Sequence, residues 1–166
     1  MTPTARYPEP SVIRFVRRFF PKPGRVLDIG SGSGNHARFF EDEGWFVWTV
    51  DECPNLRAHY HKGIEACEFP GASFDLILDH NTLCHVQVPP YQKIHQWLAG
   101  GGAFLSVHPT AETWRGVGVG KSYTRFPSEL ELRQNLASFR DVKIWRSSYP
   151  DFKGHEISSW VAWGWK

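Results

Sequence analysis

The sequence lacks the features that mark secreted, membrane-spanning and strongly charged proteins. Its three cysteines, Cys53, Cys67 and Cys84, lie far apart without C-x-x-C spacing, which indicates neither a disulfide framework nor a thiol redox motif. We find no signal peptide and no apolar run of membrane length, and therefore expect a cytoplasmic protein with no membrane partner. The formal net charge is only +2, from 19 basic and 17 acidic residues, so no strong field favours nucleic acid.

The composition is that of an ordinary globular domain. Hydrophobic residues make up 41% of the 166 residues and charged residues 22%, values typical of a chain that can bury one core. We expect a single domain over residues 1–166. The composition leaves the oligomeric state open.

The most informative segment is 25–39. A short apolar run carries Asp28 and ends in three glycines at alternate positions, Gly30, Gly32 and Gly34, and a helix-like segment follows at once. Glycines at a strand-to-helix turn allow positive φ and close approach of a ligand, and the N–H groups of the helix start face that ligand. The segment predicts a nucleotide-type cofactor site in the first βα unit of an α/β sheet.

The glycine spacing indicates which cofactor is bound. The dinucleotide fingerprint G-x-G-x-x-G does not fit, because its last position is Asn35. Asp28-x-Gly30-x-Gly32-x-Gly34 instead resembles the first motif of class I S-adenosylmethionine-dependent methyltransferases. The resemblance continues in a second strand ending in Asp51, in segment 73–79 and in segment 98–107, and so covers most of the chain. It implies S-adenosyl-L-methionine as cofactor and S-adenosyl-L-homocysteine as product.

The resemblance also implies roles for individual residues. Asp28 organises the glycine loop and the methionine end, and Asp51 accepts hydrogen bonds from both ribose hydroxyls. Glu65-Ala66 is the nearest match to the pair that meets the adenine, and whether Glu65 or the backbone N–H of Cys67 does so stays open. The expected cofactor-binding residues are Asp28, Gly30, Ser31, Gly32, Gly34, Asp51, Glu52, Glu65, Ala66, Asp79 and His80.

Histidines gather near the predicted strand ends, at His36, His80, His85 and His108. Methyl transfer from a sulfonium needs a general base only if the acceptor atom carries a proton, and histidine suits that task near neutral pH. We name His80 and His108 as candidate catalytic residues, the alternative being that they only make strand-end hydrogen bonds. No pair of histidines or cysteines has zinc-ligand spacing, so we expect no metal.

Hydrophobic periodicity predicts an α/β fold. We expect a doubly wound, mostly parallel seven-stranded sheet with an antiparallel C-terminal strand, in a three-layer α/β/α arrangement. Residues 1–24 would form an N-terminal helix and cap, and residues 109–127 a lid loop beside the ligand edge. The expected strands are 25–29, 45–50, 64–68, 74–79, 103–107, 142–149 and 157–165, and the expected helices are 10–21, 35–43, 54–62, 89–98 and 128–139.

Three functions fit these expectations. The leading one is methyl transfer to a small-molecule acceptor, because no inserted domain enlarges the substrate face and the N-terminal helix and the 109–127 loop can enclose a pocket. The second is a methyltransferase acting on RNA or protein, with the partner closing the site. The third is a non-catalytic module that binds S-adenosylmethionine or S-adenosylhomocysteine and regulates a partner.

Overall fold

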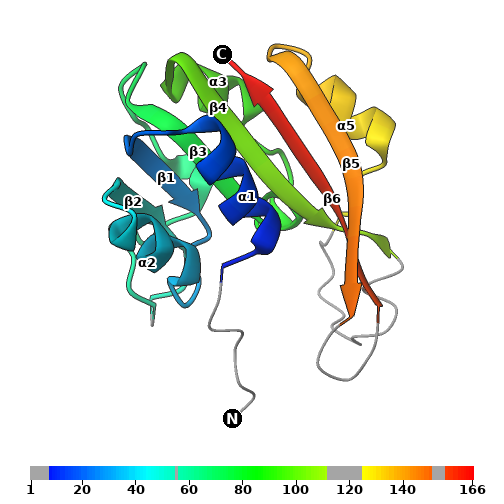
Figure 1. Ribbon diagram of the computed structural model, residues 1–166, viewed down its shortest axis with the longest axis horizontal. Helices are drawn as coiled ribbons and strands as arrows, with labels where there is room; N and C mark the ends of the chain where they lie inside the picture. The colour runs from blue at the N-terminus through cyan, green and yellow to red at the C-terminus, as the bar shows by residue number, and fades with distance from the viewer. Residues whose placement is uncertain (1–7, 55, 112–124, 151–155) are drawn as a thin grey trace.

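One mixed sheet of six strands organises the part of the chain that the structure describes. The structure is a computed structural model and describes residues 8–54, 56–111, 125–150 and 156–166. The strand order is β2-β1-β3-β4-β6-β5. The four strands β1 (Arg25–Ile29), β2 (Phe46–Val50), β3 (Phe74–His80) and β4 (Leu98–Pro109) are parallel, whereas β6 (Glu156–Trp165) runs antiparallel to both β4 and β5 (Arg140–Pro150). Figure 1 shows β6 pointing opposite to its two neighbours.

Helices cover both faces of this sheet, which confirms the doubly wound, three-layer arrangement (Figure 1). One face carries α1 (Pro10–Phe19) and α2 (Asn35–Asp42), and the other carries α3 (Tyr91–Trp97) and α5 (Glu129–Asn135). Two 3-10 turns, η1 (Ile64–Ala66) and η2 (Leu83–His85), lie in the connections on either side of β3. None of the described helices is both long and apolar enough to cross a membrane.

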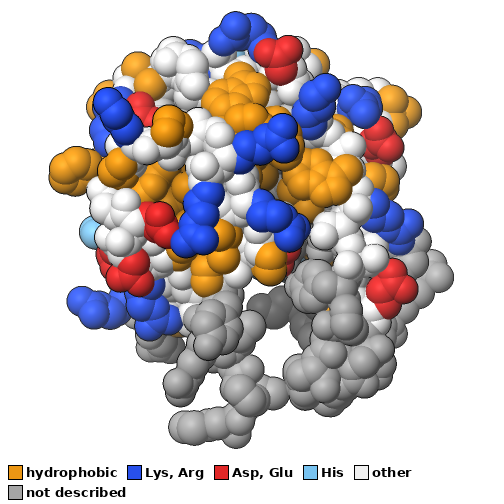
Figure 2. All heavy atoms as spheres, viewed as in Figure 1, with side chains coloured by type: hydrophobic (Ala, Val, Ile, Leu, Met, Phe, Trp, Pro, Cys, Tyr) orange, Lys and Arg blue, Asp and Glu red, His pale blue; other side chains and the backbone are white. Residues whose placement is uncertain are grey.

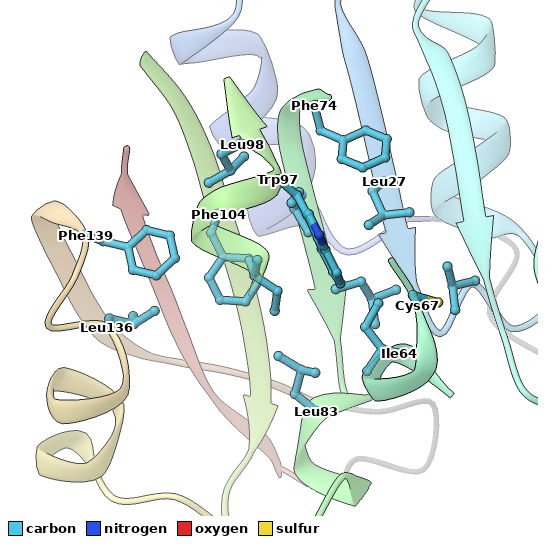
Figure 3. Close-up of a cluster of buried hydrophobic side chains, with 14 of the residues drawn as sticks. Leu27, Ile64, Cys67, Phe74, Leu83, Trp97, Leu98, Phe104, Leu136 and Phe139 are labelled. Carbon is cyan, nitrogen blue, oxygen red and sulfur yellow. The ribbon is translucent and has the colours of Figure 1, made fainter. Parts of the chain in front are cut away.

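The core on the α3 side is built from alternate strand residues and one helix face. Figure 3 shows Trp97 of α3 at the centre of this cluster, with Phe104 of β4 on one side and Leu27 of β1 on the other. Leu136 and Phe139, which follow α5, close the cluster near β6. All are buried, so this face anchors the strands whose ends form the site.

The helix α1 forms because its apolar residues recur at helical spacing behind an N-terminal proline. Pro10 occupies the first turn, where no N–H is needed, and Val12, Phe15 and Val16 bury one face. The ring of Phe15 lies 4.8 Å from that of Trp163 in β6. The opposite face is exposed, and Figure 2 shows Lys and Arg side chains interspersed with hydrophobic ones over this side of the molecule.

Two predicted elements are wrong. The expected strand 64–68 is the 3-10 turn η1, so the described sheet has six strands rather than seven. The expected helix 54–62 is also wrong, because the described residues of this segment form no helix. Tyr60 instead pairs with the end of β2: its N–H donates to the carbonyl of Thr49 at 3.1 Å, and Asp51 N–H donates to the carbonyl of Tyr60 at 3.0 Å. A backbone held this way cannot make helical hydrogen bonds.

The remaining predicted elements are confirmed. The helix expected near 128–139 is α5, and Ser128 and Glu131 form its capping box as predicted. The strand expected at 103–107 begins earlier and runs to Pro109. Of the predicted lid loop, residues 112–124 lie outside the described residues, as do residues 1–7 of the expected cap, so the lid stays a prediction.

Candidate functional site

The glycine turn after β1 has the backbone that its sequence predicts. Gly30, Gly32 and Gly34 have φ values of +68°, +53° and +78°, which L-residues with side chains rarely adopt. A Cβ on Gly30 would lie 1.8 Å from Oγ1 of Thr82, so the loop after β3 packs directly on the turn. Beside Gly34 there is nothing within 4 Å of such a Cβ, so the turn is open at its helix end. Backbone exposed in this way is accessible to a ligand.

Asp51 ties this turn to the end of β2. Its Oδ2 accepts a hydrogen bond from the N–H of Gly32 at 2.9 Å, and its Oδ1 accepts one from the N–H of Cys53, also at 2.9 Å. Each carboxylate oxygen can accept a second hydrogen bond. The partly exposed side chain can therefore hold the turn and still receive two ligand hydroxyls.

Four buried side-chain atoms of the described residues have no hydrogen-bond partner, and all lie at the carboxyl edge of the parallel strands. They are Oδ2 of Asp28, Oγ of Ser31, Oδ1 of Asn81 and Nδ1 of His108. Leaving one buried polar group unpaired costs about 1–3 kcal/mol. Such groups concentrated at one edge indicate a ligand site there, because ligands in open α/β sheets bind at this edge.

Asp28 is one of the two ionisable groups in this set. Its side chain sits on the α2 side of β1 and the residue is 1% exposed. Burial, followed by repulsion from Asp79 and Asp51, raises the pKa of the Asp28 carboxyl to about 7. A cation placed beside such a carboxyl would stabilise its ionised form, which burial and the neighbouring carboxylates disfavour.

A second buried network links β3 to β4. The strands pair in register with Asp79 opposite Ser106, and the Oγ of Ser106 lies 2.6 Å from both Oδ2 of Asp79 and Nε2 of His108. Oδ1 of Asp79 accepts the N–H groups of Thr82 and Leu83, each at 3.0 Å. Burial lowers the pKa of His108, an effect that the nearby Asp79 partly opposes.

On the other face of β3, two imidazole rings lie in contact at a tilted angle of 51°. The rings of His36 and His80 lie 4.8 Å apart, and Nε2 of His36 accepts the backbone N–H of Glu9 at 3.1 Å. Burial, then repulsion from His80, lowers the pKa of His36 to about 3, and burial is also the main cause that lowers the pKa of His80. Both rings are therefore neutral at pH 7, and they bring the segment before α1 against the strand ends.

The other predicted residues are placed as follows. Ser31 is buried in the glycine turn, whereas Glu52, Glu65 and Ala66 are exposed. Two groups were predicted as alternatives for the adenine contact, the carboxylate of Glu65 and the N–H of Cys67. The N–H of Cys67 donates to the carbonyl of Ile64 at 3.1 Å, whereas Glu65 is exposed to solvent. The side chain of Asp79 is wholly buried in its network with Ser106, so its direct contact with a cofactor stays a prediction.

A cavity of about 620 Å³ lies beside the second network. His108 reaches it from β4, Leu83 and Cys84 from η2, and Phe126 from the segment before α5. Among the described residues, no group of three or more His, Cys, Asp or Glu side chains is arranged to hold a metal ion.

Sequence reasoning did not identify Ser106, Thr82 or His36 as site residues. Ser106 and His108 are two apart on a strand and so share a face, a signal visible in the sequence. The contact of Thr82 with Gly30 had no such signal, because it depends on how two loops pack. Together the parallel strands, the open glycine turn and the acidic residues at the strand ends define a nucleotide-cofactor-binding α/β protein of the Rossmann-like class.

Comparison with known proteins narrows this class. Residues 5–159 match the family model described as a methyltransferase domain. The chain therefore belongs to this methyltransferase family, and S-adenosylmethionine is the cofactor of the class I methyltransferases that its first motif resembles. The malonyl-[acyl-carrier protein] O-methyltransferase of Enterobacter lignolyticus (strain SCF1) is 27% identical over 143 residues, which are 75% of this chain and 55% of that protein. The chain thus spans about half the length of this relative.

Solved structures show the same fold. A SAM-dependent methyltransferase from Archaeoglobus fulgidus superposes with a TM-score of 0.73 at 16% identity, covering 94% of this chain and 93% of that one. The 1,6-didemethyltoxoflavin-N1-methyltransferase of Burkholderia thailandensis, solved with 1,6-didemethyltoxoflavin and S-adenosylhomocysteine bound, gives a TM-score of 0.71 at 22% identity, covering 95% and 77%. The antiparallel C-terminal strand and the three layers therefore belong to a fold shared with these methyltransferases.

Proposed function

We propose that this protein transfers a methyl group from S-adenosylmethionine to a small-molecule acceptor, with residues 1–166 acting as one domain. The observation that carries the proposal is the cavity of about 620 Å³ that includes His108 at the carboxyl end of β4. Pockets of roughly 300–1,000 Å³ are the usual size for small-molecule sites. The Burkholderia relative of this fold was solved with a small molecule and S-adenosylhomocysteine together, which supports the same pairing here.

The residues present fit the cofactor. The unpaired Oδ2 of Asp28 is a suitable partner for the ammonium group of the methionine moiety, and Asp51 has free acceptor capacity for the ribose hydroxyls. The exposed carboxylate of Glu65 on η1 is a suitable acceptor for the amino group of the adenine. When bound, the cofactor supplies a methyl group on a positively charged sulfur, and the protein has to align an acceptor with it and exclude water.

A thermal-shift panel with S-adenosylhomocysteine, NAD and ATP tests the cofactor assignment. At about 100 times its dissociation constant, S-adenosylhomocysteine should stabilise the protein by roughly 2.7 kcal/mol, which corresponds to about 5–10 °C for a chain of this size. Asp51→Asn should reduce the shift, whereas the exposed Asp42→Asn, at the end of α2, should leave it unchanged. Stabilisation by NAD without any effect of the thioether would contradict the proposal.

A screen for transfer of a labelled methyl group then tests the acceptor. Turnover of small molecules in the absence of RNA or protein is the expected result. Transfer to RNA or protein alone would contradict the small-molecule acceptor while leaving the cofactor site intact. Tight binding of the cofactor with no transfer to any class would instead favour a regulatory module.

A further inference from the structure

The carboxylate of Asp79 determines the direction of a buried chain of hydrogen bonds. Its Oδ1 accepts two backbone N–H groups, from Thr82 and Leu83, each at 3.0 Å. Its Oδ2 accepts the hydroxyl of Ser106 at 2.6 Å, so the one proton of that hydroxyl is directed to Asp79.

The tautomer of His108 follows from this. Nε2 of His108 lies 2.6 Å from the same Oγ of Ser106, which has already donated its proton and can only accept. Nε2 of the neutral ring must then carry the hydrogen, and Nδ1 holds a bare lone pair. Nδ1 is buried with no partner among the described residues, and His108 is one of the residues that line the cavity.

We propose that Nδ1 of His108 is the general base of the methyl transfer, that Ser106 and Asp79 position it, and that the acceptor is a small molecule with a hydroxyl group. This inference rests on the proposed function. It does not extend to His80, because the ring of His80 lies against that of His36 on the opposite face of β3.

The other titratable groups of the cavity wall do not suit this role. Burial raises the pKa of the Cys84 thiol to about 12 and also raises that of the Tyr91 hydroxyl, so both remain protonated at neutral pH. The carboxylate of Glu131 is held by the backbone N–H and hydroxyl of Ser128, each at 2.8 Å, and Arg125 is a cation. Of the described titratable groups on this wall, His108 is the one whose basic atom is buried without a hydrogen-bond partner.

The bare lone pair of Nδ1 favours a hydroxyl acceptor over a cationic amine. A hydroxyl group can donate its O–H to Nδ1 and attack with an oxygen lone pair, whereas an ammonium group has no lone pair for the methyl carbon until it has lost a proton. A general base is also of use only to an acceptor atom that carries a proton.

The step balances as follows. The acceptor oxygen forms a bond to the methyl carbon, and the carbon–sulfur bond breaks with its electron pair remaining on sulfur. The hydroxyl proton passes to Nδ1 of His108. The resulting imidazolium is stabilised by Asp79, whose Oδ2 is 3.6 Å from Nε2, and it returns the proton to water when the product leaves.

Nitrogen NMR tests the tautomer without any acceptor. In the protein labelled with ¹⁵N-histidine and bound to S-adenosylhomocysteine, we expect the His108 ring, assigned by its loss in His108→Gln, to carry its hydrogen on Nε2. Ser106→Ala should release this preference and Ser106→Thr should retain it, because threonine keeps the hydroxyl. A hydrogen on Nδ1 in the wild-type protein would overturn the proposal.

Transfer assays test the base and the acceptor class. We use 4-methylphenol and 4-methylbenzylamine, an alkylamine that is cationic at neutral pH, with labelled S-adenosylmethionine, and expect the phenol to be methylated. His108→Gln should lower kcat about 100-fold or more with little change in KM, as for loss of a general base. Ser106→Ala should lower kcat less and shift the acid limb of the pH profile. The exposed His61→Gln is the matched control and should change neither.

The outcomes separate this inference from the proposed function. If the wild-type protein does not bind S-adenosylhomocysteine, the proposed function fails. If it binds the cofactor normally but His108→Gln retains full kcat, or if only the alkylamine is methylated, the proposed function survives and the role of His108 is refuted.

Discussion

Gly32 donates its backbone N–H to Oδ2 of Asp51 at 2.9 Å, which joins the glycine turn to the end of the neighbouring strand. The same carboxylate receives the N–H of Cys53 through its other oxygen. One side chain therefore shapes the turn and presents acceptor oxygens to a ligand. Stability and ligand affinity should consequently change together when it is altered.

Asp51→Ala is expected to weaken both. Loss of hydrogen bonds to a charged group should cost about 1.5–3 kcal/mol each in affinity for S-adenosylhomocysteine, and loss of the Gly32 anchor about 1–3 kcal/mol in the free energy of unfolding. Asp51→Asn keeps one acceptor and should lie between. Calorimetric titration and urea unfolding measure the two effects, and unchanged affinity in the alanine variant would remove Asp51 from the cofactor site.

Asp28→Asn should stabilise the ligand-free protein, increasingly so at higher pH. The folded pKa of Asp28, about 7, lies above its ordinary value of 3.8, so between these values the folded state holds a proton that the unfolded chain has released. The contribution of Asp28 to stability therefore falls as the pH rises through about 7. The variant should gain about 2–3 kcal/mol more over the wild type at pH 8 than at pH 5, measured by urea unfolding.

The same substitution should weaken cofactor binding, because the amide has no charge to pair with the ammonium group. If the Asp28→Asn variant were more stable at pH 8 but bound S-adenosylhomocysteine with unchanged affinity, the buried carboxyl of Asp28 would not serve to bind the cofactor.

His36 should make the fold sensitive to acid. Its folded pKa, about 3, lies below its ordinary value of 6.5, so on acidification the unfolded chain takes up a proton that the folded state cannot. Stability is therefore lost as the pH falls below 6.5, by up to about 1.4 kcal/mol per pH unit. His36→Gln should lose about 2 kcal/mol less than the wild type between pH 6.5 and 4.5, whereas the exposed His61→Gln should follow the wild type. Parallel pH profiles for all three proteins would contradict this.

Two glycines of the turn should respond differently to alanine. Gly30→Ala places a Cβ against Thr82 and should cost about 3 kcal/mol or more, whereas Gly34→Ala meets no atom and should cost only the left-handed backbone strain of about 1–2 kcal/mol. Adding Thr82→Gly to Gly30→Ala should recover part of the loss. A double-mutant cycle from urea unfolding measures this coupling, and additive effects would show that Thr82 does not restrict position 30.

The sequence predicted the elements whose side chains carry a clear period or a capping signal. The glycine turn and β3 belong to this group, as does α5 with its Ser128 capping box. The helix predicted at 54–62 was wrong because contacts with β2 determine the conformation of this segment. The hydroxyl of Thr49 in β2 is hydrogen-bonded to the ring and to the backbone N–H of His59, and Tyr60 pairs with β2 through its backbone. Such cross-connections are tertiary and override local propensity.

The candidate site was predicted unevenly for a similar reason. Asp28 precedes the first glycine by two residues and Asp51 ends the next predicted strand, so both can be named from the linear sequence. The network of Asp79, Ser106 and His108 requires the register of two strands that meet only in the fold. His108 could be named from its position at a strand end, but not its tautomer, because that depends on which atom Ser106 faces.

The position of β6 in the sheet also bears on how the protein is made. β6 lies between β4 and β5 although it follows both in the chain, so β5 has no partner until β6 is available. The apolar face of α1 is likewise incompletely covered before β6 is present, because Phe15 packs on Trp163 of β6. On the ribosome, where the chain emerges from its N-terminal end, the first helix and the fifth strand must remain exposed until residues 156–165 have left the exit tunnel. Synthesis that stops before β6 therefore leaves an unpaired strand edge and an uncovered aromatic surface, the features that chaperones and aggregation both recognise.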